Sequence, residues 1–224
     1  AIGALTAGFL IAYTSAPRVI AYVAMQGGAS TMFDLGRGKK ITPRAASITI
    51  SGRQASLRWF ERGRTHLEIA ALYLVLADNS KFAVSRRKSF LNKSLVAYHK
   101  GLSLEPRHPY SWLQYAQARF RENRRSTEIN APLRMSYVLG PQEPKIVVTR
   151  VRLGFRAQNV LSSGLRSNVR EDIRLYLKHQ PRELTIFARK QFGLPWLVDI
   201  TKDDPPLLQD LYRQFLRLPP PGDI

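Results

Sequence analysis

The first 25 residues are the most apolar stretch of the chain. Residues 1–16 carry no charge, and the apolar pattern resumes at residues 19–25, after Pro17 and Arg18. Sixteen helical residues span about 24 Å, less than the roughly 30 Å of a bilayer core. A helix that continues through Pro17, with Arg18 reaching toward the headgroups, or apolar residues upstream of Ala1, would close this gap. We therefore expect residues 1–25 to form a membrane-anchoring helix; a cleaved signal peptide and a buried core helix are the alternatives.

Residues 26–53 show little helical patterning. Glycines recur between residues 27 and 38, and only residues 47–51 have a strand-like pattern. We expect an irregular basic linker here, with one short strand. From residue 37 to residue 64, eight Lys or Arg residues accompany a single acid, Glu61. Beside a membrane anchor, the positive-inside rule would place such a segment in the cytoplasm.

From residue 54 onward, apolar residues recur at the three- and four-residue spacing of amphipathic helices. Asp78, Asn79 and Ser80 interrupt this pattern, as do several prolines. The pattern predicts an all-α fold class. The expected helices cover 54–77, 81–104, 109–120, 144–158, 167–179, 181–191 and 205–217, with a Ser/Gly turn at 162–164.

Two segments of the helical region share one pattern at an offset of 35 residues, 97–109 and 132–144. Each has a large residue, a small residue three positions later and a proline five positions after that. The small residue lets two helices approach closely, and the proline cannot continue a helix. These residues are Tyr98, Gly101 and Pro106 in the first segment, and Leu133, Ser136 and Pro141 in the second.

The tetratricopeptide repeat has the same pattern and a period of about 34 residues. Trp112, Tyr115 and Ala116 also fit the start of the first helix of such a repeat. We therefore expect a short tetratricopeptide-like α-solenoid over residues 54–192. A capping helix and a Pro-rich tail would follow at residues 193–224.

Net charge narrows the partners that this chain would bind. The 224 residues include 35 Lys or Arg and 16 Asp or Glu, so the formal charge is +19. Such a charge indicates an anionic partner: nucleic acid, acidic lipid, a polyanionic substrate or an acidic protein. The chain has no cysteine, which excludes disulfides, iron–sulfur clusters and thiol catalysis.

Signatures of catalysis are weak. The glycine-rich segment 36–42 lacks the first glycine and the Ser/Thr of a phosphate-binding loop. The four histidines have no metal-ligand spacing, and Asp203 and Asp204 precede a proline at an expected helix start, where carboxylates act as caps. We therefore expect no enzyme activity, no cofactor and no metal.

The tetratricopeptide interpretation predicts a binding groove. In such arrays, fixed positions of each first helix line the concave wall, and the register of Trp112 places basic and aromatic side chains there. Arginine binds carboxylates and phosphates bidentately, so this wall would suit an anionic ligand. A solvated basic surface is the alternative. The predicted groove residues are Tyr110, Gln117, Phe120, Arg121, Lys145, Arg152 and Arg156.

The order of segments along the chain resembles that of a known family. After the apolar N-terminal helix come the motifs at 104–116, 131–144, 150–155 and 170–177, of which LRMSYVLGPQEP is the least generic. Over residues 95–192 the chain resembles small membrane-anchored tetratricopeptide proteins that are encoded beside exopolysaccharide and O-antigen genes in proteobacteria. The resemblance implies a single-pass accessory protein of the bacterial inner membrane with a periplasmic domain, whereas the basic flank favours the cytoplasm.

These observations lead to one principal functional hypothesis. The chain would be a non-catalytic membrane-tethered scaffold that docks a partner protein or an anionic glycan during polysaccharide assembly. Residues 1–25 would contact the bilayer, and the basic surface could also meet lipid headgroups. The alternative is an accessory subunit of another membrane complex. Nucleic acid is the less favoured partner, because no nucleic-acid motif is present.

Overall fold

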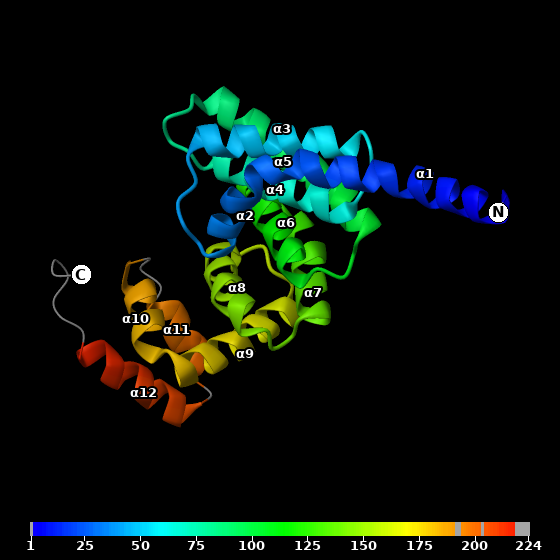
Figure 1. The fold of residues 1–224 in the computed structure, drawn as a ribbon. Coiled ribbons are helices and arrows are strands. Elements are labelled where there is room, and N and C mark those ends of the chain that lie inside the picture. The colour runs from blue at the N-terminus through cyan, green and yellow to red at the C-terminus, as the bar shows by residue number, and fades with distance from the viewer. Residues whose placement is uncertain (1, 191–193, 203, 218–224) are drawn as a thin grey trace. The chain divides into compact units, whose positions relative to one another are not determined.

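The computed structural model describes residues 2–190, 194–202 and 204–217 (Figure 1). For some of these residues it describes the backbone alone, namely 2–5, 7–10, 145, 190, 194, 196, 200 and 201. Every element among these residues is a helix, so the predicted all-α class is confirmed. The chain divides into two compact units, Ala1–Ala118 and Arg119–Ile224. The division falls within helix α6 (Pro109–Glu122). The tetratricopeptide-like solenoid itself stays a prediction.

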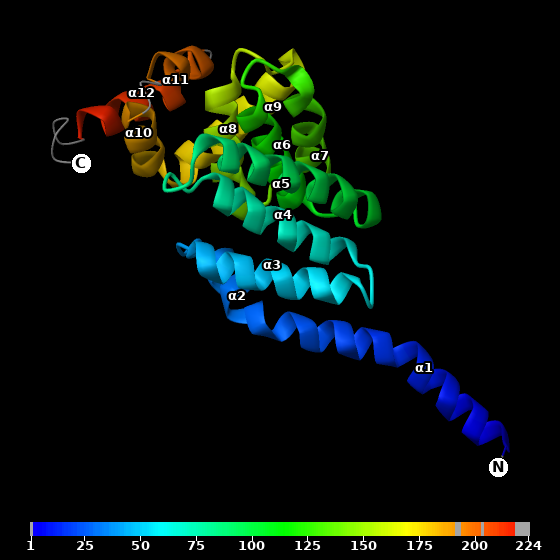
Figure 2. The same ribbon diagram turned by 90° about the horizontal axis from the view of Figure 1, so that it is seen from above.

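The first unit is built on helices that lie side by side (Figure 2). Helix α3 packs between α1 and α4, and α4 packs against α5. The bounds are α1 (Ile2–Met25), a short 3-10 turn η1 (Gln26–Gly28), α2 (Ala29–Gly36), α3 (Pro43–Leu57), α4 (Gly63–Ala77) and α5 (Val84–Leu104).

The predicted linker and strand at residues 26–53 are wrong, because α2 and α3 occupy this stretch. Local signals start α3: Pro43 stands in its first turn, and the Thr42 hydroxyl accepts a hydrogen bond from the Ala45 amide at 3.2 Å. Gly52 does not break the helix. A Cβ atom there would lie 2.7 Å from the Ala24 carbonyl oxygen, so this glycine lets α3 approach α1. The expected helix 54–77 is likewise two helices, α3 and α4.

Helix α1 continues through Pro17 to Met25, as expected from the sequence. However, none of the helices in the described part of the chain is long and apolar enough to cross a membrane. This finding overturns the expected single-pass inner-membrane location. Arg18 also does not extend toward headgroups. Its guanidinium bonds the Thr14 carbonyl at 2.9 Å and lies 5.0 Å from the centre of the Phe60 ring.

A close contact between α4 and α5 organises the core of the first unit. Gly63 and Gly101 face each other: a Cβ on Gly101 would lie 3.0 Å from the Gly63 carbonyl oxygen and 2.7 Å from Leu67. The two helices therefore approach closely near this point, and apolar side chains fill the remaining space. The core includes Ala46, Ile50, Leu67, Ile69, Ala70, Leu72, Leu74, Leu76, Leu95, Ala97, Tyr98, Leu102, Tyr115 and Ala118.

In the second unit, helix α9 (Ser163–His179) contacts the other helices around it. These are α7 (Asn130–Leu139), α8 (Pro144–Ala157), α10 (Pro181–Lys190), α11 (Leu194–Thr201) and α12 (Pro205–Leu216), and a 3-10 turn, η2 (Thr127–Ile129), precedes α7. Most expected helices appear close to their predicted bounds. The predicted turn at 162–164 is wrong, because α9 already begins at Ser163. The Pro-rich end at residues 218–224 lies outside the described residues.

Part of the repeat pattern corresponds to matching helix boundaries. Helices α5 and α7 end at Leu104 and Leu139, and α6 and α8 begin at Pro109 and Pro144, so both boundaries keep the 35-residue offset. The connecting turns are closed by different side chains. The Trp112 indole donates to the Pro106 carbonyl at 2.7 Å, whereas the Arg150 guanidinium donates to the Pro141 carbonyl at 2.8 Å.

The Gly101 contact yields a stability prediction. Alanine is the better helix former, yet in Gly101→Ala the added methyl would collide with Leu67 and the Gly63 carbonyl, so we expect a loss of about 1–3 kcal/mol. Denaturant unfolding followed by circular dichroism measures this loss. Gly36→Ala is the control, because a Cβ at residue 36 meets no atom within 4 Å. Equal stability of both variants would contradict the close packing of α4 and α5.

Candidate functional site

The predicted groove residues are divided between the two units. Tyr110 and Gln117 belong to the first unit, and the others to the second. Phe120 is buried, whereas Arg121 and Arg156 are exposed. The Arg152 guanidinium lies 5.5 Å from the centre of the Phe187 ring, and the side chain of Lys145 lies outside the described part of the structure. That these residues form one groove stays a prediction.

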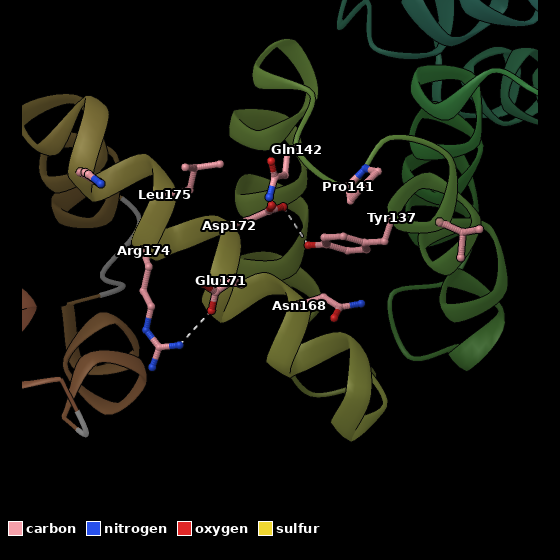
Figure 3. A pocket seen from close by; sticks show the side chains of 10 residues that line it. Tyr137, Pro141, Gln142, Asn168, Glu171, Asp172, Arg174 and Leu175 are labelled. Atoms are coloured by element: carbon pink, nitrogen blue, oxygen red, sulfur yellow. Dashed lines mark hydrogen bonds and ion pairs between the residues drawn. The ribbon is translucent and has the colours of Figure 1, made fainter.

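Within the second unit, a concave site lies between the end of α7 and the side of α9 (Figure 3). We call it the α7–α9 groove, and its volume is about 570 Å³. Such a volume lies within the usual range of ligand sites. The groove is lined by Tyr137, Val138, Pro141, Gln142, Asn168, Glu171, Asp172, Arg174, Leu175 and Lys178.

A buried ion pair fixes the base of this groove. Arg150 of α8 is fully buried and binds Asp172 of α9 bidentately, with Nε–Oδ2 and Nη2–Oδ1 distances of 2.8 and 3.1 Å. Its remaining N–H groups donate to the carbonyls of Ser136 (3.3 Å), Gly140 (2.8 Å) and Pro141 (2.8 Å). All five donors of the guanidinium are thus used. This one side chain thus donates to the two carbonyls that directly follow α7, and it adds a second donor to the Ser136 carbonyl, which also accepts from the Gly140 amide.

Tyr137 completes the cluster from the α7 side. Its hydroxyl donates to Asp172 Oδ2 at 2.9 Å, and the Arg150 guanidinium carbon lies 4.1 Å from the centre of its ring. The ring is therefore held by a cation–π contact at its face and a charge-assisted hydrogen bond at its edge. Three helices, α7, α8 and α9, meet at these three side chains.

Burial has the largest effect on the pKa values of Asp172 and Tyr137. Loss of solvent raises the pKa of Asp172 to about 6, although Arg150 and Tyr137 act in the opposite direction. Burial likewise raises the pKa of Tyr137 well above its ordinary value, and the neighbouring Asp172 charge adds to this. At neutral pH the carboxylate is ionised and the phenol is protonated, so the network is fully hydrogen-bonded. We assign these groups the role of holding the groove in shape.

The groove surface combines apolar, amide and charged groups. Val138 is 67% exposed, and Pro141 and Leu175 also line the groove. The side-chain amides of Gln142 and Asn168 are exposed, and neither makes a hydrogen bond with a described group. Each amide offers both donors and acceptors. An incoming polar backbone would find unused partners here.

Two cations extend from α9 at the same groove. Arg174 pairs with Glu171 at 2.9 Å and with Asp204 at 3.6 Å. Lys178 is exposed and forms no ion pair with any of the described acids. Lys178 is therefore the cation at this site that can meet a negative charge without displacing an existing partner.

A second hollow of about 370 Å³ adjoins the groove and shares Gln142 and Leu175 with it. This hollow is more apolar and continues along α8 through Val147 and Val148 toward His179. The two hollows lie next to each other around the turn after α7. Because they share two lining residues, the two hollows form one continuous surface.

Sequence reasoning missed this site. Arg150 stands at the position that Tyr115 occupies 35 residues earlier, so a charge replaces a buried aromatic residue of the repeat pattern. A charge at a core position needs a partner, and Asp172 lies on the apolar face of its helix with Val169 and Ile173. Arg150 and Asp172 are thus two charged exceptions to the apolar pattern, and they were the signal of this site that the sequence offered. Because the two residues lie far apart in the chain, no local pattern showed that they form a pair.

The described residues contain no group of three or more side chains that could hold a metal ion. In comparisons with protein-family models, curated proteins and solved structures, nothing matched this chain. The resemblance to polysaccharide-associated proteins therefore remains an expectation from the sequence, and the site has to be interpreted from its geometry.

Replacing Arg150 tests the ion pair. Arg150→Met would leave the Asp172 carboxylate buried without its cationic partner and would remove the side-chain donor of the Gly140 and Pro141 carbonyls, so we expect a loss of about 3–5 kcal/mol at pH 7. Urea unfolding followed by circular dichroism gives the value. The control is Arg166→Met, which removes the same charge from an exposed position of α9. A loss no larger than that of the control would disprove the structural role of Arg150.

The raised pKa of Asp172 predicts a pH dependence of stability. A carboxyl whose folded pKa lies above its unfolded value of 3.8 stabilises the fold below that value, and this contribution is lost as the pH rises through about 6. Relative to Asp172→Asn, which does not titrate, the wild-type chain should lose up to about 3 kcal/mol between pH 4 and pH 7. Paired urea titrations at both pH values measure the difference. A relative gain for the wild type would mean that the ion pair outweighs burial.

Proposed function

We propose that this protein is a non-catalytic helical docking module that binds a peptide segment of a partner protein in the α7–α9 groove. One observation carries the proposal: the groove joins an apolar surface to two amides and a lysine that have no partner among the described residues, on a base fixed by Arg150. Binding sites commonly combine such a surface with a few fixed polar groups.

The amides favour a peptide backbone as the ligand. Gln142 precedes α8 and Asn168 lies in α9, so the two flank the groove from different elements (Figure 3). A peptide bond presents one donor and one acceptor, and a carboxamide can bond both. Val138, Pro141 and Leu175 would take up an apolar side chain of the same segment.

Charge then selects among peptide segments. Lys178 has no described acidic partner, and the chain carries a formal charge of +19. An acidic side chain placed near Lys178 would gain an ion pair and would be attracted over a longer range. The preferred segment is therefore apolar with an acidic residue close by.

An anionic glycan is less well supported at this groove. Sugars commonly bind through an exposed aromatic face, yet Tyr137 is buried and its ring already faces the Arg150 guanidinium. A partner from polysaccharide assembly is supported by the sequence resemblance alone.

A second candidate function is that of a subunit in a larger assembly. Several large apolar side chains of α1 are exposed, and an assembly would cover them. They are Ile11, Tyr13, Val19, Tyr22 and Val23, with exposures between 59 and 72%. This candidate concerns the first unit and is compatible with peptide docking by the second.

A peptide selection tests the proposed function. We expect random linear peptides displayed on phage to yield binders that contain an acidic residue beside apolar ones. Synthetic copies should bind Lys178→Glu about tenfold more weakly than the wild type, because a repulsion replaces an attraction. Fluorescence anisotropy measures the affinities.

Arg166→Glu is the matched control, since it reverses the charge of an exposed α9 residue outside the groove. Its affinity should stay within about twofold of the wild type. The proposal fails if no peptide sequence is enriched, or if both charge reversals weaken binding equally. Binding of acidic oligosaccharides without any peptide binding would also contradict it.

A further inference from the structure

Helix α5 carries a regular row of positive charges. Between Asn79 and Leu104 the chain contains no acid, and Arg86, Lys93 and Lys100 follow one another at intervals of seven residues. Seven residues are close to two helical turns, so these cations recur about every 10.5 Å along one face. All three side chains are exposed.

Small side chains lie between the cations on the same face. Ser89, Val96 and Ser103 follow the cations by three residues each, and all are exposed, Val96 to 71%. We call these six residues, Arg86, Ser89, Lys93, Val96, Lys100 and Ser103, the α5 stripe. Its spacing of three and four residues is that of a helix–helix contact, and its small members would let a second backbone approach.

Aromatic rings hold two of the three cations in place. The Arg86 guanidinium lies 4.6 Å from the centre of the Phe82 ring and 5.6 Å from that of Phe90, and the Lys93 ammonium lies 5.7 Å from that of Tyr73. The rings pack together, with the Tyr73 and Phe90 centroids 6.1 Å apart. Side chains that are already ordered lose less entropy when they bind a ligand.

Two of the three cations of the stripe, Arg86 and Lys93, have no acidic partner among the described residues of their unit. Residues 1–118 include 16 Lys or Arg and five acids. Asp34, Glu68 and Glu105 pair with other residues, and Glu61 pairs with Lys100 at 3.2 Å. Neither Arg86 nor Lys93 forms an ion pair with a described acid. An external acidic group could therefore pair with Arg86 and Lys93 without displacing an existing carboxylate.

We infer that the α5 stripe binds an acidic α-helix of a partner protein, whose carboxylates repeat every seven residues. The inference goes beyond the proposed function, because it concerns the first unit and does not depend on the α7–α9 groove. An acidic helix presents its charges at the same axial interval as the stripe, and both helices can then pair along their length. Nucleic acid fits less well, because one strand of duplex DNA carries a charge about every 3.4 Å, and the stripe offers a cation only about every 10.5 Å.

Two synthetic peptides test the inference on the intact chain. Both have 21 residues, the length of α5, and the same alanine-rich composition with three glutamates. One peptide spaces the glutamates by seven residues, and the other places them on different faces. We expect the matched peptide to bind at least about tenfold more tightly in fluorescence anisotropy, with an affinity that falls as salt is added.

Charge reversal within α5 locates the binding surface. Lys93→Glu should weaken the matched peptide about tenfold, whereas Lys88→Glu should change its affinity less than about twofold. Lys88 is exposed on the same helix but lies off the stripe. Both variants replace one lysine by glutamate, so they carry the same net charge. Circular dichroism of both variants shows whether the helices are retained.

Three results would overturn the inference. Equal affinity for the two peptides would mean that the seven-residue spacing is irrelevant. Equal effects of Lys88→Glu and Lys93→Glu, with helicity retained, would assign binding to general charge. Tighter binding of a single-stranded oligonucleotide or a polyuronate than of the matched peptide would identify a linear polyanion as the occupant instead.

Discussion

Carbonyl groups at and just after a buried helix end need hydrogen-bond donors, and in each unit of this protein an arginine from a later helix bonds some of them. In the first unit, Arg53 of α3 bonds the carbonyl of Met25, the last residue of α1, at 2.6 Å, and bonds Glu68 of α4 at 2.9 Å. In the second unit, Arg150 serves the end of α7 and pairs with Asp172 of α9. Each arginine thereby joins three helices, and each acidic partner offsets the cost of burying its charge.

The arginine in the second unit explains why the α7–α9 groove can be a binding surface. The turn at residues 140–143 contributes Pro141 and Gln142 to the lining, and Arg150 holds two carbonyls of this turn. A turn fixed in this way need not be ordered by the ligand, so more of the contact energy remains for affinity. The cluster of Arg150, Asp172 and Tyr137 is thus a support for the groove, and in the proposed function the exposed amides and Lys178 would meet the ligand.

How far the sequence predicts this structure depends on the element. Prolines at 109, 144, 181 and 205 indicated helix starts, and α6, α8, α10 and α12 begin there.

Helix α3 was missed because glycine, serine and threonine are poor helix formers in isolation. In the structure Gly52 serves packing against α1, which local sequence cannot show. The apolar N-terminal pattern predicted a helix correctly, but the predicted membrane span was wrong, because no described helix is long and apolar enough to cross a membrane. The groove depends on a pairing between α8 and α9, which no local pattern reveals.

The two turns that share the 35-residue offset are closed by chemically different groups. A neutral indole bonds the carbonyl in the turn before α6, and a charged guanidinium does so in the turn before α8. The indole bond itself does not titrate, and the ionisable groups beside it are Glu105 and His108, which pair at 3.2 Å and are partly exposed. The guanidinium bond comes from an arginine that also holds Asp172, a carboxyl whose pKa is raised to about 6 by burial. One turn therefore carries its ionisable pair beside the closing bond and open to solvent, and the other carries it buried within the cluster that closes the turn.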